Sequence, residues 1–263
     1  DMSRTKEALL EVMASIERLL ATFHDGRIVR DGLKAAIVGP PNAGKSSLFN
    51  WLLGHDRAIV HHAPGTTRDV IDGEMSIGGT RLMLRDTAGM RDSPDEVESI
   101  GVGLSRKAIE WSDITLLVID SSAPLPRDVM PLIETLEPAR TIAILNKSDL
   151  PARLEVGYFE RFKIKVCVSA LTSQGEKELK EAISSFMPKL DAGGALLTNV
   201  RHKDAIDKAR NELSAAFHAM DNETEDVLAE HLRRAQEHLS AVTGGTTSED
   251  ILCRIFERFC VGK

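Results

Sequence analysis

The chain has 263 residues, of which 42% are hydrophobic and 28% charged, and its formal net charge is −7. No apolar run approaches the roughly 18 residues that a membrane span requires, and the acidic balance argues against a generally basic nucleic-acid clamp, so neither a membrane nor DNA is expected as a partner. Three cysteines make no disulfide framework and no secretory signal is present, so we expect a cytoplasmic protein.

The N-terminal region is expected to be helical. Five apolar residues recur at spacings of three and four and predict a helix over residues 2–23: Leu9, Met13, Ile16, Leu20 and Phe23. Gly26 and the polar residues up to Gly32 are expected to end this helical pattern. Because Asp1-Met2 already lies in the helix, we expect that N-terminal sequence of a longer protein is missing.

Residues 33–188 alternate short apolar runs with helical stretches. The run 33–38 leads into a glycine-rich loop, and residues 70–77 and 81–85 flank Gly78-Gly79, which predicts an antiparallel hairpin. Three further runs, 114–120, 141–146 and 164–168, are expected to be strands buried on both faces, which would place Cys167 in the core. The pattern predicts a mostly parallel sheet with helices on both sides.

Beyond a glycine-containing linker at 191–194, the apolar periodicity becomes helical again. One stripe comprises Ile206, Ala209, Leu213, Ala216 and Met220, and a second comprises Val227, Leu228, Leu232, Ala235 and Leu239. Thr247 and Asp250 resemble an N-cap pair that opens a last helix. We therefore expect a helical bundle of residues 1–30 and 191–263, into which an α/β domain of residues 31–190 is inserted.

The segment Gly39-Pro40-Pro41-Asn42-Ala43-Gly44-Lys45-Ser46 has the eight-residue phosphate-loop pattern between a predicted strand and helix. Backbone N–H groups at a helix N-terminus suit phosphate oxygens. Lys45 can reach the β- and γ-phosphates, and the Ser46 hydroxyl can ligate magnesium. This context favours a nucleotide site over a glycine-rich turn that binds nothing.

Four other motifs occur in the order of a Ras-like P-loop G domain, the fold class that we predict. Asn146-Lys147-Ser148-Asp149 follows a strand, and its aspartate can accept from the guanine N1 and N2 donors, which selects GTP and GDP over adenine nucleotides. Ser169-Ala170 resembles the loop that supports the base. Asp86-Thr87-Ala88-Gly89 and the Thr66-Thr67 loop resemble the two switches, which respond to magnesium and the γ-phosphate.

The motifs together define the residues that we expect to contact the nucleotide. They are Asn42, Ala43, Gly44, Lys45, Ser46, Ser47, Thr66, Thr67, Asp86, Thr87, Ala88, Gly89, Asn146, Lys147, Asp149, Ser169 and Ala170. Position 90 is methionine, where Ras-like enzymes commonly have a glutamine that orients the attacking water. Another group must therefore position that water, and an acidic run that includes Glu98 lies just downstream, although such a run is usually a solvated face.

With these motifs, the hydrophobic Met90, the Gly65-Thr66-Thr67-Arg68-Asp69 loop and the terminal Phe259-Cys260-Val261-Gly262-Lys263, the whole chain resembles the MnmE (TrmE) family of tRNA-modification GTPases. Val261 departs mildly from the isoleucine that is usual in that family. The family's N-terminal folate-binding domain is absent, so the resemblance implies a fragment.

The resemblance implies a GTPase that potassium stimulates through transient face-to-face pairing of two G domains. Asn42 would ligate potassium by its side chain, together with the backbone carbonyls of His61, Ala63 and Thr66. Ser46 and Thr67 would hold magnesium. Glu98 aligns with the acidic residue thought to orient the attacking water through a bridging water.

The resemblance also implies tRNA as the ultimate substrate, an MnmG-type partner, and modification of the wobble uridine at carbon 5 with an aminomethyl-type group. Cys260 would serve that modification, and Lys263 would approach the folate site, with a folate derivative bound only in the full-length protein. The simpler alternatives are that Cys260 fills a position in the apolar stripe of a helix and that Lys263 is a solvent-exposed chain end.

A ribosome-assembly GTPase of the Era or Der type is the main alternative, since it shares the loop at residues 65–69. A KH-like module with a GxxG loop would mark it, and Gly244-Gly245 offers no such loop. A helical adaptor with a degenerate nucleotide site is a third alternative, which the intact Lys45, Ser46 and Asp149 argue against.

Overall fold

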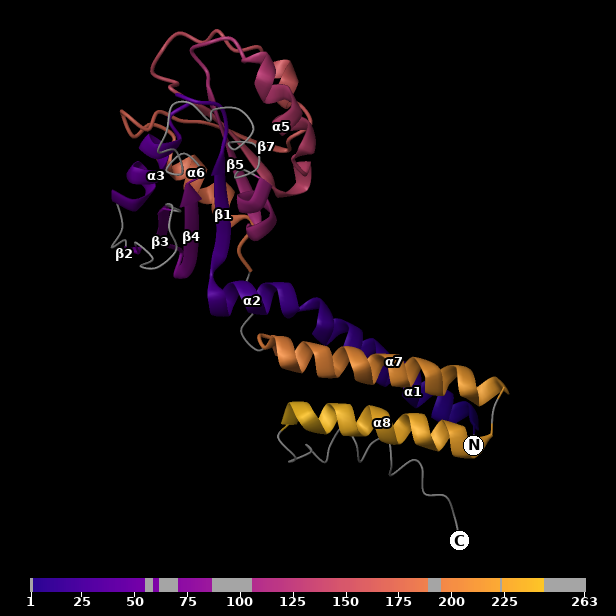
Figure 1. Cartoon of the computed structure of the whole chain (residues 1–263). Coiled ribbons are helices and arrows are strands. Elements are labelled where there is room, and N and C mark those ends of the chain that lie inside the picture. Colours follow the sequence, from indigo (N-terminus) through magenta and orange to yellow (C-terminus); the bar gives the residue numbers. More distant parts are fainter. Residues whose placement is uncertain are drawn as a thin grey trace. The chain divides into compact units, whose positions relative to one another are not determined.

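The computed structural model describes residues 2–54, 59–61, 71–86, 106–188, 195–222 and 224–243. The chain divides into two compact units. The first, which we call the helical unit, comprises Asp1–Arg30 and Lys189–Lys263. The second, which we call the sheet unit, comprises Asp31–Pro188. Figure 1 shows the elements of both.

A seven-stranded sheet of order β2-β3-β4-β1-β5-β6-β7 organises the sheet unit. Its strands are β1 (Leu33–Val38), β2 (Ile59–His61), β3 (Ile71–Ile77), β4 (Thr80–Asp86), β5 (Ile114–Asp120), β6 (Thr141–Asn146) and β7 (Ile164–Cys167). β1 pairs in parallel with β4 and β5, and β6 pairs in parallel with β5 and β7. This mostly parallel sheet confirms the predicted α/β class.

The predicted antiparallel hairpin is formed by β3 and β4, whose register runs from Ile71 opposite Asp86 to Ile77 opposite Thr80. Gly78 and Gly79 connect the strands with φ values of 58° and 84°, a conformation that glycine adopts at little cost. β2 adds a second antiparallel pair, with β3. The sequence analysis did not identify β2, because three residues are too short to show a periodic pattern.

Helices cover both faces of the sheet. They are α3 (Lys45–Gly54), α5 (Met130–Thr135) and α6 (Glu176–Ser184), with a helical stretch at 106–111 and 3₁₀ turns at Arg127–Val129, Pro138–Arg140 and Val156–Phe159. Alternate residues of β1, β5 and β6, among them Val38 and Leu117, form one core with Ile133 of α5. α3 packs on β1, β3 and β4, and α6 packs on β7. Figure 1 shows α3 and α6 on one side of the sheet and α5 on the other.

One expectation about burial was wrong. β5 and β6 are buried almost throughout, but β7 is an edge strand, and Lys165 and Cys167 on it are exposed. The prediction of a core position for Cys167 failed because an edge strand has only one neighbouring strand, and one of its faces here meets solvent.

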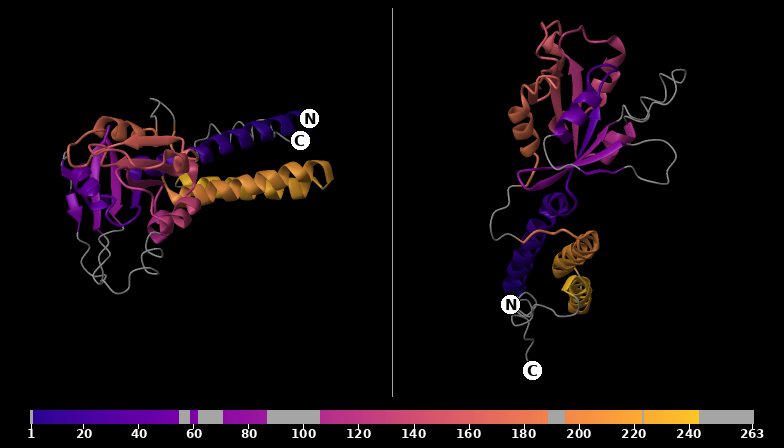
Figure 2. Two further views of the ribbon diagram at one scale, coloured as in Figure 1. Left: turned by 90° about the horizontal axis from the view of Figure 1, so that it is seen from above. Right: turned by 90° about the vertical axis from the view of Figure 1, so that its left-hand side faces the viewer.

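The helical unit contains α1 (Met2–Ala21), α2 (Phe23–Asp31), α7 (Val200–Asn222) and α8 (Glu225–Thr243). α7 packs extensively against α8 and also against α1, and Figures 1 and 2 show α7 and α8 side by side. The predicted stripes form one apolar cluster, which includes Leu9 and Ile16 of α1, Leu213 of α7 and Leu232 of α8. In the described residues of this unit, the predicted all-helical class is thereby confirmed.

Gly26 does not stop the helical pattern, contrary to the prediction. It lies inside α2 and donates its N–H to the Thr22 carbonyl over 2.8 Å. Its Cα faces the Leu197 carbonyl so closely that a Cβ there would clash with it. The glycine serves close packing, and the chain leaves the helix at Gly32, where φ is 93°. The predicted last helix from Thr247 lies outside the described residues.

Candidate nucleotide-binding site

The phosphate loop connects β1 to α3 and takes its shape from left-handed backbone positions. Gly39 has φ 145° and lies against the Val118 carbonyl, while Gly44 has φ 92° and lies against the side-chain amide of Asn146. A Cβ on either glycine would clash with these groups. Asn42 has φ 61°, a conformation that asparagine tolerates better than most residues. The motif's glycines are therefore required by the packing of this loop.

At the start of α3, two side chains of the motif are already engaged. Lys45 is 6% exposed, and its Nζ donates to the Pro40 carbonyl over 2.7 Å. The Ser46 hydroxyl donates to Asp86 Oδ2 over 3.0 Å, and Asp86, at the end of β4, is 1% exposed. A hydroxyl and a carboxylate oxygen so placed are the hard oxygen donors that magnesium prefers, so these residues fit that ion.

Asn146, the last residue of β6, joins three loops. Its Nδ2 donates to the Ala43 carbonyl over 2.8 Å, and its Oδ1 accepts from the Ala170 N–H over 3.2 Å. With 2% of its surface exposed, it fixes the phosphate loop against the Ser169-Ala170 loop. Both polar ends of the amide are used, so replacement by an apolar residue would leave buried groups unpaired.

The loop after β7 is held by its own hydrogen bonds and by α3. Buried Ser169 donates its N–H to the Gln174 carbonyl over 3.0 Å, and its hydroxyl accepts from Thr172 N over 3.2 Å. Trp51 of α3 donates its indole N–H to the Ser173 hydroxyl over 3.0 Å. The helix that begins at the phosphate loop thus also supports the segment that follows Ala170.

Sequence reasoning missed an ion pair beside these motifs. Lys147 Nζ lies 2.6 Å from Asp120 Oδ2, and Asp120 is the last residue of β5. Burial alone would raise the pKa of Asp120, but hydrogen bonds from Lys147 and Ser122 outweigh it and hold the pKa below its ordinary value. The available signal was positional, since both residues stand at the carboxyl ends of neighbouring parallel strands.

Among the residues predicted for the site, the structure joins Ala43 and Ala170 through Asn146, and Ser46 to Asp86. The predicted nucleotide residues that are described are Asn42, Ala43, Gly44, Lys45, Ser46, Ser47, Asp86, Asn146, Lys147, Asp149, Ser169 and Ala170. Asp149 is exposed. For His61 only the backbone is described, as part of β2. Others lie outside the described residues: Ala63, Thr66, Thr67, Thr87, Ala88, Gly89, Glu98, Cys260 and Lys263.

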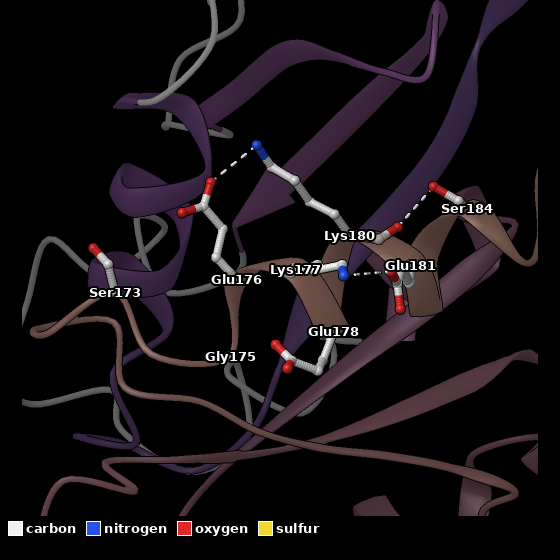
Figure 3. A pocket seen from close by; sticks show the side chains of 8 residues that line it. All are labelled: Ser173, Gly175, Glu176, Lys177, Glu178, Lys180, Glu181 and Ser184. Carbon is white, nitrogen blue, oxygen red and sulfur yellow. Dashed lines mark hydrogen bonds and ion pairs between the residues drawn. The ribbon is translucent and has the colours of Figure 1, made fainter.

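A separate open pocket of about 530 Å³ runs along α6 and does not coincide with the nucleotide motifs. Figure 3 shows that charged side chains of α6 pair with each other beside it. Lys180 Nζ lies 2.9 Å from Glu176 Oε1, and Lys177 Nζ lies 3.9 Å from Glu181 Oε1. Because both lysines have carboxylate partners, this pocket is a poor candidate for binding phosphate.

The fold and the site define a Ras-like P-loop G domain joined to an all-helical unit. A family model described as the MnmE helical domain matches residues 1–260, and the chain belongs to the MnmE family.

Two relatives show the extent of the similarity. The chain is 38% identical over 270 residues to the tRNA modification GTPase MnmE of Natranaerobius thermophilus. This alignment covers 100% of this chain and 59% of the relative. It is 40% identical over 266 residues to MnmE of Clostridioides difficile, covering 98% of this chain and 58% of the relative. The chain therefore spans just under three fifths of the length of these relatives.

Among solved structures, the G domain of the T. maritima FeoB iron transporter has 27% sequence identity and a TM-score of 0.44, and the match covers 58% of this chain and 97% of that one. In the part of the present chain that the structure describes, no helix combines the length and the apolar character needed to cross a bilayer.

Proposed function

We propose that this chain is a GTP hydrolase whose G domain comprises residues 31–190. The observation that supports this most strongly is the double hydrogen bond of Asn146, which joins Ala43 of the phosphate loop to Ala170 of the base loop. This arrangement holds the two loops at a fixed separation, as the phosphate and base ends of one bound nucleotide would require. The exposed Asp149 is the proposed acceptor for the guanine N1 and N2 donors.

In the proposed reaction, α3 binds the phosphates through its N-terminal backbone N–H groups and Lys45. Lys45 would exchange its Pro40 carbonyl for phosphate oxygens. Ser46 and Asp86 would hold magnesium, together with Thr67, and the bound ion would neutralise charge on the phosphates. Glu98 is the proposed residue that orients the attacking water, through a bridging water, since Met90 has no acceptor for that task.

A second cation is proposed to make hydrolysis potassium-dependent. Asn42 stands in the phosphate loop with an exposed side chain and φ 61°, and it would bind potassium with the carbonyls of His61, Ala63 and Thr66. Pairing of two G domains would complete that site, so the active species is a transient homodimer.

The cellular role that we propose is cytoplasmic modification of the wobble uridine of tRNA at carbon 5, with an MnmG-type partner. It rests on family membership and on relatives named tRNA modification GTPases. The proposed helical domain, made of residues 1–30 together with 191–263, would carry Cys260, needed for modification, and Lys263, directed to a folate site. Because the chain spans just under three fifths of those relatives, folate chemistry is proposed only for the full-length protein.

The test is GTP hydrolysis by the chain in potassium and in sodium over a range of protein concentrations. We expect a rate that is higher in potassium and that rises more than linearly with protein. Equal rates in the two salts would exclude the potassium site, and a strictly linear dependence would exclude pairing. Glu98→Ala should retain GTP binding and lose hydrolysis, whereas an unchanged rate would remove the role of Glu98.

A further inference from the structure

Asp120 and Lys147 meet at the carboxyl ends of two neighbouring parallel strands. β5 and β6 pair so that Asp120 is opposite Asn146, which places Lys147 one residue beyond that pair. The Nζ to Oδ2 distance is 2.6 Å, and 34% of the lysine side chain and 21% of the aspartate side chain are exposed. A pair that is mostly shielded from water interacts more strongly than the usual surface ion pair.

The other carboxylate oxygen of Asp120 is also occupied. Oδ1 accepts from the Ser122 N–H over 2.8 Å and from the Ser122 hydroxyl over 2.6 Å. The two hydrogen bonds from Ser122 to Oδ1 orient the carboxylate and leave Oδ2 for the lysine. Asp120 is therefore an anchor that can hold the flexible lysine side chain in one position.

Lys147 stands between two residues with assigned tasks. Asn146 before it joins the phosphate and base loops, and Asp149 after it is the proposed guanine acceptor. Lys147 itself has φ 63°, so its backbone turns sharply away from β6. Its Nζ is bound to Asp120, so the side chain is held at the carboxyl ends of β5 and β6, beside two residues of the candidate nucleotide site.

We propose that Asp120 is a positioning residue for guanine-nucleotide binding and that it acts through Lys147. Anchoring the lysine in the free protein removes the entropy loss that ordering this side chain would otherwise add to binding. This inference rests on the proposed function, since it requires that the site binds guanine nucleotides.

A purely structural role for Asp120 makes a different prediction. Asp120 also shapes the turn at Ser121-Ser122, and the Ser121 carbonyl accepts from the N–H groups of Arg153 and Leu154. If the turn alone mattered, Asp120→Asn would be harmless, because its amide oxygen can still accept from Ser122. Any effect that it did have on the GDP dissociation constant would be the same with lysine or alanine at position 147.

The experiment is a double-mutant cycle of Asp120→Asn and Lys147→Ala in the whole chain, read out by titration with fluorescent GDP. Asp120→Asn alone should raise the GDP dissociation constant about tenfold, since it weakens a charge-assisted hydrogen bond. In the Lys147→Ala background the same change should alter the constant less than about twofold. Asp128→Ala, which removes an exposed aspartate elsewhere in the sheet unit, should leave it unchanged.

Thermal unfolding without nucleotide separates a binding effect from a folding effect, and each variant should unfold within a few degrees of the wild type. Equal effects of Asp120→Asn in both backgrounds, or an unchanged dissociation constant, would overturn the inference while leaving the proposed function intact. A wild-type chain that fails to bind GDP would overturn both.

Discussion

The two units of this chain are specified by different kinds of information. In the sheet unit the nucleotide site depends on single atoms, such as the amide of Asn146 and the missing Cβ of Gly44. In the helical unit, α1, α7 and α8 share one apolar cluster in which many side chains contribute. A single substitution should therefore abolish function in the first unit and reduce stability by degrees in the second.

The largest effect is expected for Asn146→Ala. The change removes two hydrogen bonds and leaves the buried Ala43 carbonyl and the partly buried Ala170 N–H without these partners, so GDP affinity should fall by about two orders of magnitude. Titration with fluorescent GDP measures it. Asn211→Ala in the helical unit is the matched control and should bind GDP normally, whereas similar affinities for the two variants would contradict the joining role of Asn146.

Shortening a buried side chain tests the comparison in the helical unit. Leu213 of α7 is 2% exposed, and Leu213→Ala should lower the free energy of unfolding of the helical unit by about 3 kcal/mol through lost burial and a new cavity. Urea unfolding measures it, while GDP affinity should stay unchanged. Leu10, which is 48% exposed, provides the control, and Leu10→Ala should cost less than about 0.5 kcal/mol.

Gly26 is a described position of the helical unit where a single atom should matter, as single atoms do in the sheet unit. A methyl group there would meet the Leu197 carbonyl, so Gly26→Ala should destabilise this unit by about 1–3 kcal/mol although alanine favours helices. Gly54→Ala, where nothing lies within 4 Å of the added Cβ, is the control. Equal stability of the Gly26 variant and the wild type in urea would contradict the close packing.

The smallest expected effect depends on pH. The pKa of Asp120 is lowered from 3.8, so its contribution to stability is complete above that value and disappears as the pH falls through the lower folded-state pKa. The difference in urea midpoint between the wild type and Asp120→Asn should be largest near neutral pH and should shrink below about pH 4. A difference that grew on acidification would contradict the sign of the shift.

Much of the sheet unit could be predicted because its signals are local. Continuous apolar runs located β5 and β6, and Gly78-Gly79 located the hairpin turn. The exposure of Cys167 could not be predicted, since a strand's place at the edge of a sheet is a property of the whole topology.

Contacts between residues far apart in the chain could not be predicted from the sequence either. Gly26 looked like a helix stop because its partner, the Leu197 carbonyl, is 171 residues away. The Asp120–Lys147 pair depends on the register of β5 and β6. Motifs therefore predicted the residues of the candidate site, and only the pairing of strands showed that Asp120 contacts one of them, Lys147.

The most direct test of the central claim is competition for a fluorescent GDP probe bound to the whole chain. We predict that unlabelled GDP displaces the probe and that ADP does so at least about a thousandfold more weakly. Adenine lacks the pair of N–H donors that the Asp149 carboxylate would accept from on guanine. Equal displacement by ADP and GDP, or no binding of the probe, would contradict the assignment of a guanine-nucleotide site to the sheet unit.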